Sequence, residues 1–423
     1  MKAKSDNNII GFWLCRAKKC KNLIFFIIYR SNILIIIFYF GFAMRLYERG
    51  YRQGTGQGFV RCIGCLSQWL EQRGCKDYEL NECKVLDYLE SIKHRRGVAT
   101  RKSPYFLFLS YLREMGIIKQ PQLQPMNAVT RIVNQYIDYL RQERGLEEST
   151  LVRRHVVPCQ FLEYRFGKKP VVLSQLKAKD FIKYIQDYDN GYSITYRFNV
   201  VSTLRDFCRF LYLYEYIRDD IATSIPRTPY RTIRLPNYLR HSDVERILKT
   251  CERKTPKGIR NYAILLLLIR LGLRAGEVRN LTLDDIDWRR GEFTICGKGC
   301  KHNRLPLPQE VGKALVHYLQ HGRPQCSSRH LFIHLRAPYT KIQGSSPIGG
   351  IVRQAIKRIG LNPPHKGAHV LRHTFATHLL HRGASLTEIG KMLGHGSLNS
   401  TLIYAHIDFK NLKKVAQPWP GGE

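Results

Sequence analysis

An internal repeat in the first half of the chain most constrains how it can fold. The segment FVRCIGCLSQWLE, Phe59 to Glu71, aligns with LVRRHVVPCQFLE, Leu151 to Glu163, and both contain Gln-x-Leu-Glu. Two further pairs of segments match in the same order, 80–93 with 173–186 and 108–118 with 207–217. Apolar residues recur at three- and four-residue spacing in each copy, which is the pattern of amphipathic helices. We therefore predict two helical modules of about four helices each, produced by a duplication.

Prolines mark the ends of both copies and predict where the domains divide. Pro121 and Pro125 follow the first copy, and a basic segment with Pro226, Pro229 and Pro236 follows the second. Such segments are typical of linkers. We expect a helical repeat at 44–125, a second helical domain at 127–226 and a third domain at 236–417.

The charge of the chain indicates its partner. Lys plus Arg number 69 against 33 Asp plus Glu, a formal net charge of +36, and the excess is spread along the whole length. Seven arginines of the second copy give it a basic surface: Arg141, Arg144, Arg153, Arg154, Arg197, Arg205 and Arg209. A spread excess of this size suits a polyanion, because each neutralised phosphate releases counterions. We expect double-stranded DNA as the partner and a cytoplasmic location.

The first 43 residues differ from the rest of the chain. Leu23 to Phe42 is almost entirely apolar, and Lys18, Lys19 and Lys21 precede it as they would a membrane-spanning helix. The Asn, Lys, Ile, Phe and Tyr content of this segment is also what untranslated AT-rich DNA would encode, and the composition changes at Met44. We favour Met44 as the initiator and do not expect a membrane partner. A membrane anchor is the alternative.

Two groups of residues resemble metal sites but do not predict one. Cys62, Cys65, Cys75 and Cys83 suggest zinc, but Cys62 to Cys65 lies in an apolar helical pattern, where buried free thiols are common. His365, His369 and His373 are spaced four apart, but Arg372 beside them would repel a cation. We expect no metal and no cofactor.

The third domain contains three clusters of residues suited to phosphate chemistry. In LGLRAGEVRN, Gly272 ends one helix and Arg274 lies at the start of the next, with Glu277 one turn on and placed to orient its guanidinium. The planar fork of arginine can bind two phosphate oxygens at once. In GEFTICGKGCKHNRLPLP, two strands flank a Gly-Lys-Gly turn, which can extend Lys298 into a groove.

The third cluster combines proton-transfer groups with a nucleophile. His369 and Arg372 of HVLRHTFATHLL are three apart, so they share one helix face. LGHGSLNSTLIYAHID then contains His395 and Tyr404. Taken alone, Tyr404 would be read as a core residue on an amphipathic helix that starts near Leu398. Its place after the other clusters makes a nucleophile the better reading.

These motifs resemble those of the tyrosine recombinases, the phage integrase family. GLRAGE, the GKG hairpin, HVLRH, LGH and the final tyrosine stand in that family's order and at its spacings, and the likeness covers about Asn127 to Gln417. The resemblance implies an active site of six residues: Arg274, Lys298, His369, Arg372, His395 and Tyr404. Glu277 has no direct catalytic role in the family motif.

The resemblance also implies a mechanism. Tyr404 would attack a DNA phosphodiester and form a 3′-phosphotyrosine link, which conserves bond energy so that no ATP is needed. No metal would be required, because the arginines supply the charge that a metal otherwise would. Arg274 and Arg372 would stabilise the transition-state charge, and Lys298 would protonate the leaving 5′-oxygen. His369 would assist proton transfer at the tyrosine, and His395 would hydrogen-bond the phosphate.

The implied fold is mainly α. A helical core-binding (SAM-like) domain, here preceded by an extra helical copy, would precede an α+β catalytic domain with a small antiparallel sheet near Trp288 to Leu307. Helical modules and catalytic domain would clamp DNA in a C shape, and four chains would assemble on paired sites. Integrase, transposase and resolvase roles stay open. A type IB topoisomerase is the nearest enzymatic alternative, and a catalytically idle DNA-binding regulator is an alternative of another class.

Overall fold

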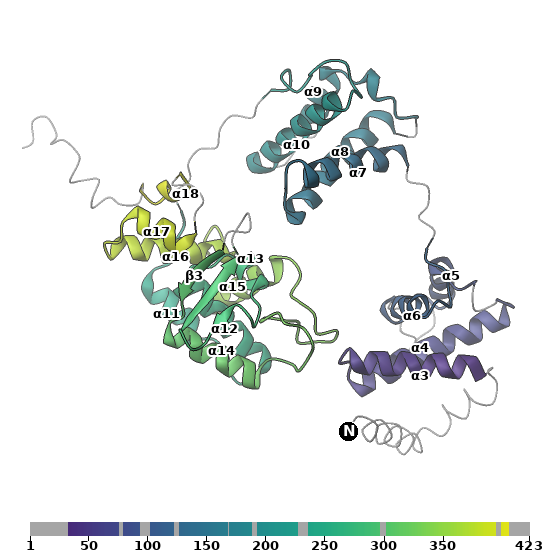
Figure 1. The fold of residues 1–423 in the computed structure, drawn as a ribbon, viewed down its shortest axis with the longest axis horizontal. Coiled ribbons are helices and arrows are strands. Elements are labelled where there is room, and N and C mark those ends of the chain that lie inside the picture. Colours follow the sequence, from purple (N-terminus) through teal and green to yellow (C-terminus); the bar gives the residue numbers. More distant parts are fainter. Residues whose placement is uncertain are drawn as a thin grey trace, which may run out of the picture. The chain divides into compact units, whose positions relative to one another are not determined.

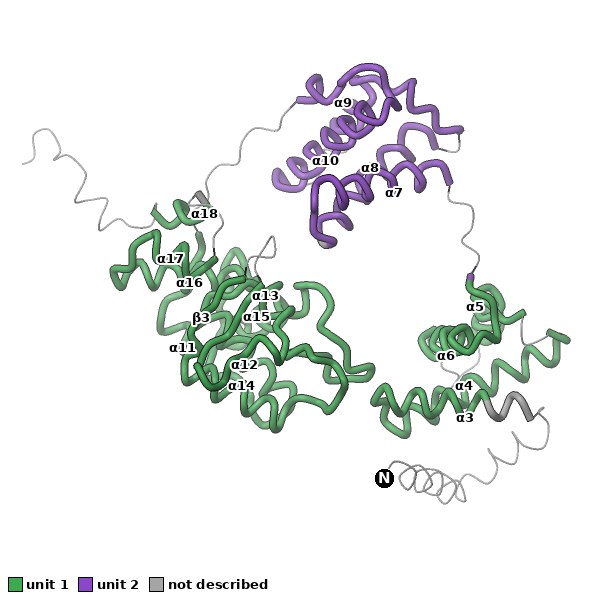
Figure 2. The backbone as a smooth tube through the Cα atoms, in the orientation of Figure 1, with its two compact units in different colours: residues 1–120, 234–423 green, residues 121–233 purple. Residues whose placement is uncertain are grey.

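Most of the described chain is helical, and its three short strands form one sheet (Figure 1). The structure, a computed structural model, describes residues 33–75, 79–93, 102–121, 127–167, 169–187, 193–226, 236–296, 302–394 and 399–405. Figure 2 divides the chain into two compact units, residues 121–233 and residues 1–120 with 234–423. The predicted fold class, mainly α with a small antiparallel sheet, is confirmed.

The first helical module consists of α3 (Ile33–Glu48), α4 (Gln53–Gln72), α5 (Glu82–Ser91) and α6 (Ser103–Glu114). Apolar residues from all four helices meet in one buried cluster. The start of α5 is fixed by Asn81, whose side chain accepts a hydrogen bond from the backbone N–H of Lys84 at 3.1 Å. Such a cap satisfies one of the free amides at a helix start.

The helix α3 crosses the position that composition suggested as the first residue. It begins at Ile33, and Tyr39 and Phe42 are buried with Leu46 in the core of the first module. The predicted start of the first module at Met44 is therefore wrong. The module begins earlier in the chain, because Tyr39 and Phe42 before that residue form part of its core. Within the described helices, none is both long and apolar enough to cross a lipid bilayer.

The second module repeats the arrangement of the first. It contains α7 (Ala128–Gln142), α8 (Glu148–Phe166), the 3-10 turn η3 (Leu173–Gln175), α9 (Ala178–Asp187) and α10 (Ile194–Leu213). The helices pack in the same pairs: α3–α4 corresponds to α7–α8, and α4–α6 corresponds to α8–α10. In each module the third helix contacts the second and the fourth. The predicted duplication into four-helix modules is consistent with this shared packing.

Residues shared by the two copies fall on corresponding surfaces. Leu70 and Leu162 are both buried, whereas the identical pairs Arg61 with Arg153 and Gln68 with Gln160 are exposed. Identity at exposed positions is not required for packing. The two copies therefore have some of the same exposed residues at equivalent positions, in addition to the same helix packing.

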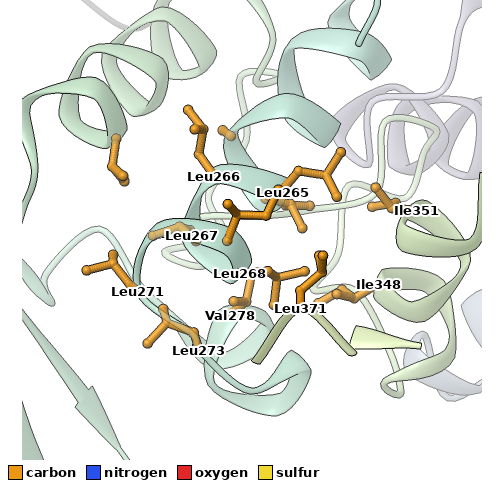
Figure 3. Packing of buried hydrophobic residues seen from close by; sticks show 14 of the residues in the cluster. Leu265, Leu266, Leu267, Leu268, Leu271, Leu273, Val278, Ile348, Ile351 and Leu371 are labelled. Carbon is orange, nitrogen blue, oxygen red and sulfur yellow. The ribbon is translucent and has the colours of Figure 1, made fainter. Parts of the chain in front are cut away.

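The third region contains eight helices among its described residues: α11 (His241–Lys249), α12 (Pro256–Arg270), α13 (Ala275–Asn280), α14 (Gln309–His321), α15 (Ser346–Arg358), α16 (Ala368–His381), α17 (Leu386–Leu393) and α18 (Asn399–Leu402). The central helix is α12. Thr255 caps it by accepting from the N–H of Gly258 at 3.2 Å, and every residue from Ala263 to Ile269 is buried. Figure 3 shows leucines of α12 packed with Ile348 of α15 and Leu371 of α16.

The sheet lies next to this core. Strands β1 (Ile286–Asp287), β2 (Glu292–Cys296) and β3 (His302–Pro306) pair antiparallel in that order, with Phe293 opposite Leu305 and Cys296 opposite His302. Phe293, Ile295 and Leu305 are buried in the main core. This alternation of buried and outward residues is what fixes the register of a half-buried sheet. The two predicted strands are confirmed as β2 and β3, which pair with each other.

Candidate active site

A sharp chain reversal after α12 positions Arg274. Gly272 has a φ of +62°, which favours glycine. A Cβ atom there would lie 2.5 Å from Cδ1 of Phe375 and 3.0 Å from Cδ2 of Leu393. A side chain at this position would therefore strain the reversal. It leads to Arg274, the N-cap of α13, as the sequence predicted.

Arg372 is buried on α16 and held by two backbone carbonyls. Its side chain is 5% exposed. Nη1 donates to the carbonyl of Gly272 at 2.8 Å, and Nη2 donates to the carbonyl of Leu393 at 2.5 Å. Leu393 ends α17, where Gly394 takes a left-handed conformation with φ +61°. Two chain reversals, each with a glycine, thus fix the direction of this guanidinium.

Glu277 joins the two arginines. Its Oε1 accepts from Nη1 of Arg274 at 2.6 Å, and its Oε2 accepts from the backbone N–H of Arg274 at 2.7 Å. The same Oε2 lies 3.9 Å from Nη1 of Arg372. The carboxylate is buried, so it offsets two positive charges in a place that water screens poorly. The prediction that Glu277 orients the guanidinium of Arg274 is confirmed.

Tyr404 both fills a core and offers its hydroxyl to the site. It lies in a turn just after the short helix α18 rather than within a helix, and its N–H donates to the carbonyl of Thr401 at 3.0 Å. The residue is 1% exposed and packs with Ala376, Ile389 and Leu393. Its hydroxyl lies 2.9 Å from Nδ1 of His373. The packing interpretation is therefore confirmed, and the functional one stays a prediction that this position of the hydroxyl allows.

The electrostatics of the site favour an anion and a protonated tyrosine. Burial raises the pKa of Tyr404 to about 12, although the charges of Arg372 and Arg274 oppose the shift. Burial lowers the pKa of Arg372 to about 10, and the nearby charge of Arg274 acts in the same direction. The positive charges of both arginines therefore act on the tyrosine hydroxyl. With a pKa of about 10, Arg372 stays cationic at neutral pH. Two guanidiniums whose charges act on one hydroxyl have the chemistry to bind a phosphate there.

The structure brings together three of the six predicted site residues and places a fourth beside them. Arg274, Arg372 and Tyr404 lie at one site. His369 is exposed one turn before His373, with ring centroids 6.3 Å apart. Partial loss of hydration lowers the pKa of His369, and the charges of Arg372 and Arg274 lower it further. Lys298 and His395 lie outside the described residues.

Sequence reasoning missed His373. In the sequence it is only the third histidine of a run that does not predict a metal site. In the structure its imidazole is hydrogen-bonded to the hydroxyl of Tyr404. The available signal was its spacing, because a residue four after His369 lies on the same helix face. Among the described residues, no three His, Cys, Asp or Glu side chains are grouped to hold a metal ion.

A family model and curated relatives of this chain indicate the same protein family. Residues 237–411 match the model of the Phage integrase family. The chain is 35% identical over 390 residues to y4rA of Sinorhizobium fredii, a predicted integrase/recombinase, covering 92% of this chain and 95% of that protein. It is 32% identical over 304 residues to tyrosine recombinase XerD of Proteus mirabilis, covering 68% of this chain and 91% of XerD.

Solved structures agree in fold. The XerH site-specific recombinase bound to a palindromic difH substrate superposes with a TM-score of 0.54 at 23% identity, covering 68% of this chain and 84% of XerH. An integrase of the Tn1549 transposon in complex with a circular intermediate DNA gives a TM-score of 0.50 at 17% identity, covering 67% and 99%. At these identities the likeness concerns the fold.

Proposed function

Because this chain belongs to the phage integrase family of tyrosine recombinases, we propose that it cuts and rejoins DNA at specific sites through a covalent bond between Tyr404 and a 3′-phosphate. The observation that carries the proposal is the position of the Tyr404 hydroxyl, buried where Arg372 and Arg274 both act on it. A nucleophile beside two fixed guanidiniums suits a phosphodiester better than a neutral substrate.

The arginines bind the scissile phosphate. Arg372 uses one N–H of each terminal nitrogen on a backbone carbonyl, so its remaining donors stay available to the non-bridging oxygens. Arg274 is fixed by Glu277 and approaches from the start of α13. Because both donors are positioned before DNA arrives, little reorganisation is needed as charge develops on the phosphate.

The remaining predicted residues complete the chemistry. Lys298, in the loop between β2 and β3, is the proposed acid for the leaving 5′-oxygen. His395 is proposed to hydrogen-bond the phosphate. We place His369 at the phosphate as well, because Arg372 and Arg274 act on it and because another histidine is bonded to Tyr404. The proposed cycle conserves bond energy in the phosphotyrosine, so it needs no ATP, and the two arginines supply the positive charge that a metal otherwise would.

The helical modules supply the grip on DNA. The whole chain carries a formal charge of +36, and the two copies share exposed Arg and Gln residues. Phosphate contacts by such residues fix a protein on a duplex without reading its sequence. We propose that four chains assemble on two DNA sites, since strand exchange requires four cuts.

A trapping experiment tests the proposal. The probe is a pool of nicked duplex oligonucleotides tiled across the DNA that flanks the gene, in which the cleaved strand loses a short fragment and cannot be rejoined. The natural chain should give an adduct that survives denaturing electrophoresis, whereas Tyr404→Phe should bind the same DNA and give none. Adduct formation by Tyr404→Phe would contradict the proposal.

A further inference from the structure

We propose that His373 accepts the hydroxyl proton of Tyr404 when the tyrosine attacks DNA. The inference rests on the proposed function and adds a catalytic residue to it. Nδ1 of His373 lies 2.9 Å from the tyrosine oxygen, and the two ring centroids are 5.7 Å apart. In the part of the chain that the structure describes, His373 is the side chain hydrogen-bonded to that hydroxyl.

The imidazole is in the form that accepts a proton. Burial lowers the pKa of His373 to about 4, and the positive charges of His369, Arg372 and His365 act in the same direction. At neutral pH the ring is therefore uncharged and has one nitrogen lone pair. With Tyr404 protonated, the hydrogen bond runs from the hydroxyl to Nδ1, and the ring carries its own proton on Nε2.

His369 is less well placed for this role. It lies one turn earlier on α16, its ring is 6.3 Å from that of His373 between centroids, and it is exposed. A proton acceptor has to reach the oxygen directly or through one water. The geometry thus separates the two histidines, with His373 at the nucleophile and His369 toward the phosphate.

Cleavage forms one bond to phosphorus, breaks another and moves two protons. The Tyr404 oxygen forms a bond to phosphorus, and its proton moves to Nδ1 of His373. The bond from phosphorus to the 5′-oxygen breaks, and that oxygen leaves with the electron pair and takes a proton from Lys298. In the rejoining half a 5′-hydroxyl attacks phosphorus and gives its proton back to the amine of Lys298. The bond from phosphorus to the Tyr404 oxygen breaks, and that oxygen takes the proton back from Nδ1 of His373.

Charge in the site explains why the proton moves only when DNA is bound. Without DNA, an imidazolium at His373 would face the positive Arg372, whose neighbour Glu277 is already shared with Arg274. A bound phosphodiester adds a negative charge among these groups and so favours the protonated imidazole. As the tyrosine oxygen bonds to phosphorus, its proton becomes much more acidic. Both changes are local to the reacting complex.

The test compares rates of adduct formation for the natural chain, His373→Phe and His373→Asn on the same nicked substrate. Asn can accept a hydrogen bond from the hydroxyl but cannot take its proton at neutral pH. We expect both variants to be slower by about 100-fold, the size of a general-base contribution. His381→Asn, an exposed position on the same helix, is the control and should keep the natural rate.

Two further measurements exclude a merely structural role for His373. The rate of His373→Phe should rise about tenfold for each pH unit between 7 and 9, because only the phenolate then attacks, whereas the natural chain should change less. A 5′-bridging phosphorothiolate, whose sulfur leaves without an acid, should restore Lys298→Ala and not His373→Phe.

The possible outcomes are distinct. If the natural chain forms no adduct, the proposed function itself fails. If the adduct forms and His373→Asn matches the natural rate, His373 only positions the hydroxyl. If the phosphorothiolate restores His373→Phe, the histidine acts on the leaving group. Either of the last two results would overturn the inference and leave the recombinase assignment in place.

Discussion

The guanidinium of Arg372 donates a hydrogen bond to the carbonyl of Gly272 at 2.8 Å, across 100 residues of sequence. This bond connects helix α16 to the reversal between α12 and α13, so the position of Arg372 and the turn that presents Arg274 depend on each other. A carbonyl can point at the arginine because the backbone of Gly272 adopts a positive φ.

Replacing this glycine should therefore destabilise the site. In Gly272→Ala the new methyl group would meet Phe375 and the backbone would be held in a left-handed conformation. We expect a loss of about 2–4 kcal/mol in the free energy of unfolding. Gly276→Ala is the matched control, since a Cβ atom there meets nothing within 4 Å. Urea unfolding of both variants checks this, and equal stabilities would show that the reversal tolerates a side chain.

The carboxylate between the arginines should matter for the rate of cleavage more than for DNA binding. Glu277→Gln keeps the shape but removes the negative charge shared by Arg274 and Arg372. We expect adduct formation to slow by about 100-fold, because misplaced catalytic groups have effects of that size. Gel-shift affinity should change little, since most phosphate contacts lie elsewhere. Glu310→Gln, which removes an exposed partner of Arg270, is the control. A parallel loss of binding and cleavage by Glu277→Gln would contradict this role.

Much of the site follows from the sequence, for identifiable reasons. Arg274 and Arg372 lie in short motifs whose local structure is set by helix spacing and a glycine turn, so their positions in these elements could be predicted. The choice between His369 and His373 could not, because both lie on one face of α16. The packing of α17 against α16, and of α18 against α17, determines which of the two imidazole rings lies beside Tyr404. That packing is tertiary structure, which helix spacing alone does not predict.

The first helical module shows a different limit. Composition set the residues before Met44 apart, yet their burial depends on whether α4 and α6 offer an apolar surface to α3. Tyr39 and Phe42 pack there, as the hydrophobic cluster shows. The pairing of helices in the two modules, by contrast, followed from the repeat in the sequence.

Stability at acid pH should report on the environment of His373. Its pKa of about 4 in the folded chain lies below the value of 6.5 for a free side chain. The neutral ring therefore contributes stability above pH 6.5 that is lost as the pH falls through 4. We expect Tm to fall less between pH 6.5 and 4 for His373→Phe than for the natural chain. His381→Phe, at an exposed position, should follow the natural chain. Parallel curves for all three would contradict the lowered pKa of His373.

A pair of phenylalanines tests whether α3 belongs to the fold. Phe42 is 1% exposed and Phe40 is 48% exposed on the same helix. We expect Phe42→Ala to cost about 3–5 kcal/mol in the free energy of unfolding of the first module, and Phe40→Ala to cost little. A chain that begins at Met44 lacks both Tyr39 and Phe42, so it should be less stable as well. Equal stability of the shortened chain would show that α3 does not pack as described.

The most direct test of the central claim is to identify the residue that becomes bonded to DNA. After trapping on the nicked substrate, the adduct is digested with nuclease and protease and the peptides are sequenced by mass spectrometry. We predict that a nucleotide is attached through its 3′-phosphate to the peptide containing Tyr404. A nucleotide on another residue, or a link through a 5′-phosphate, would contradict the account.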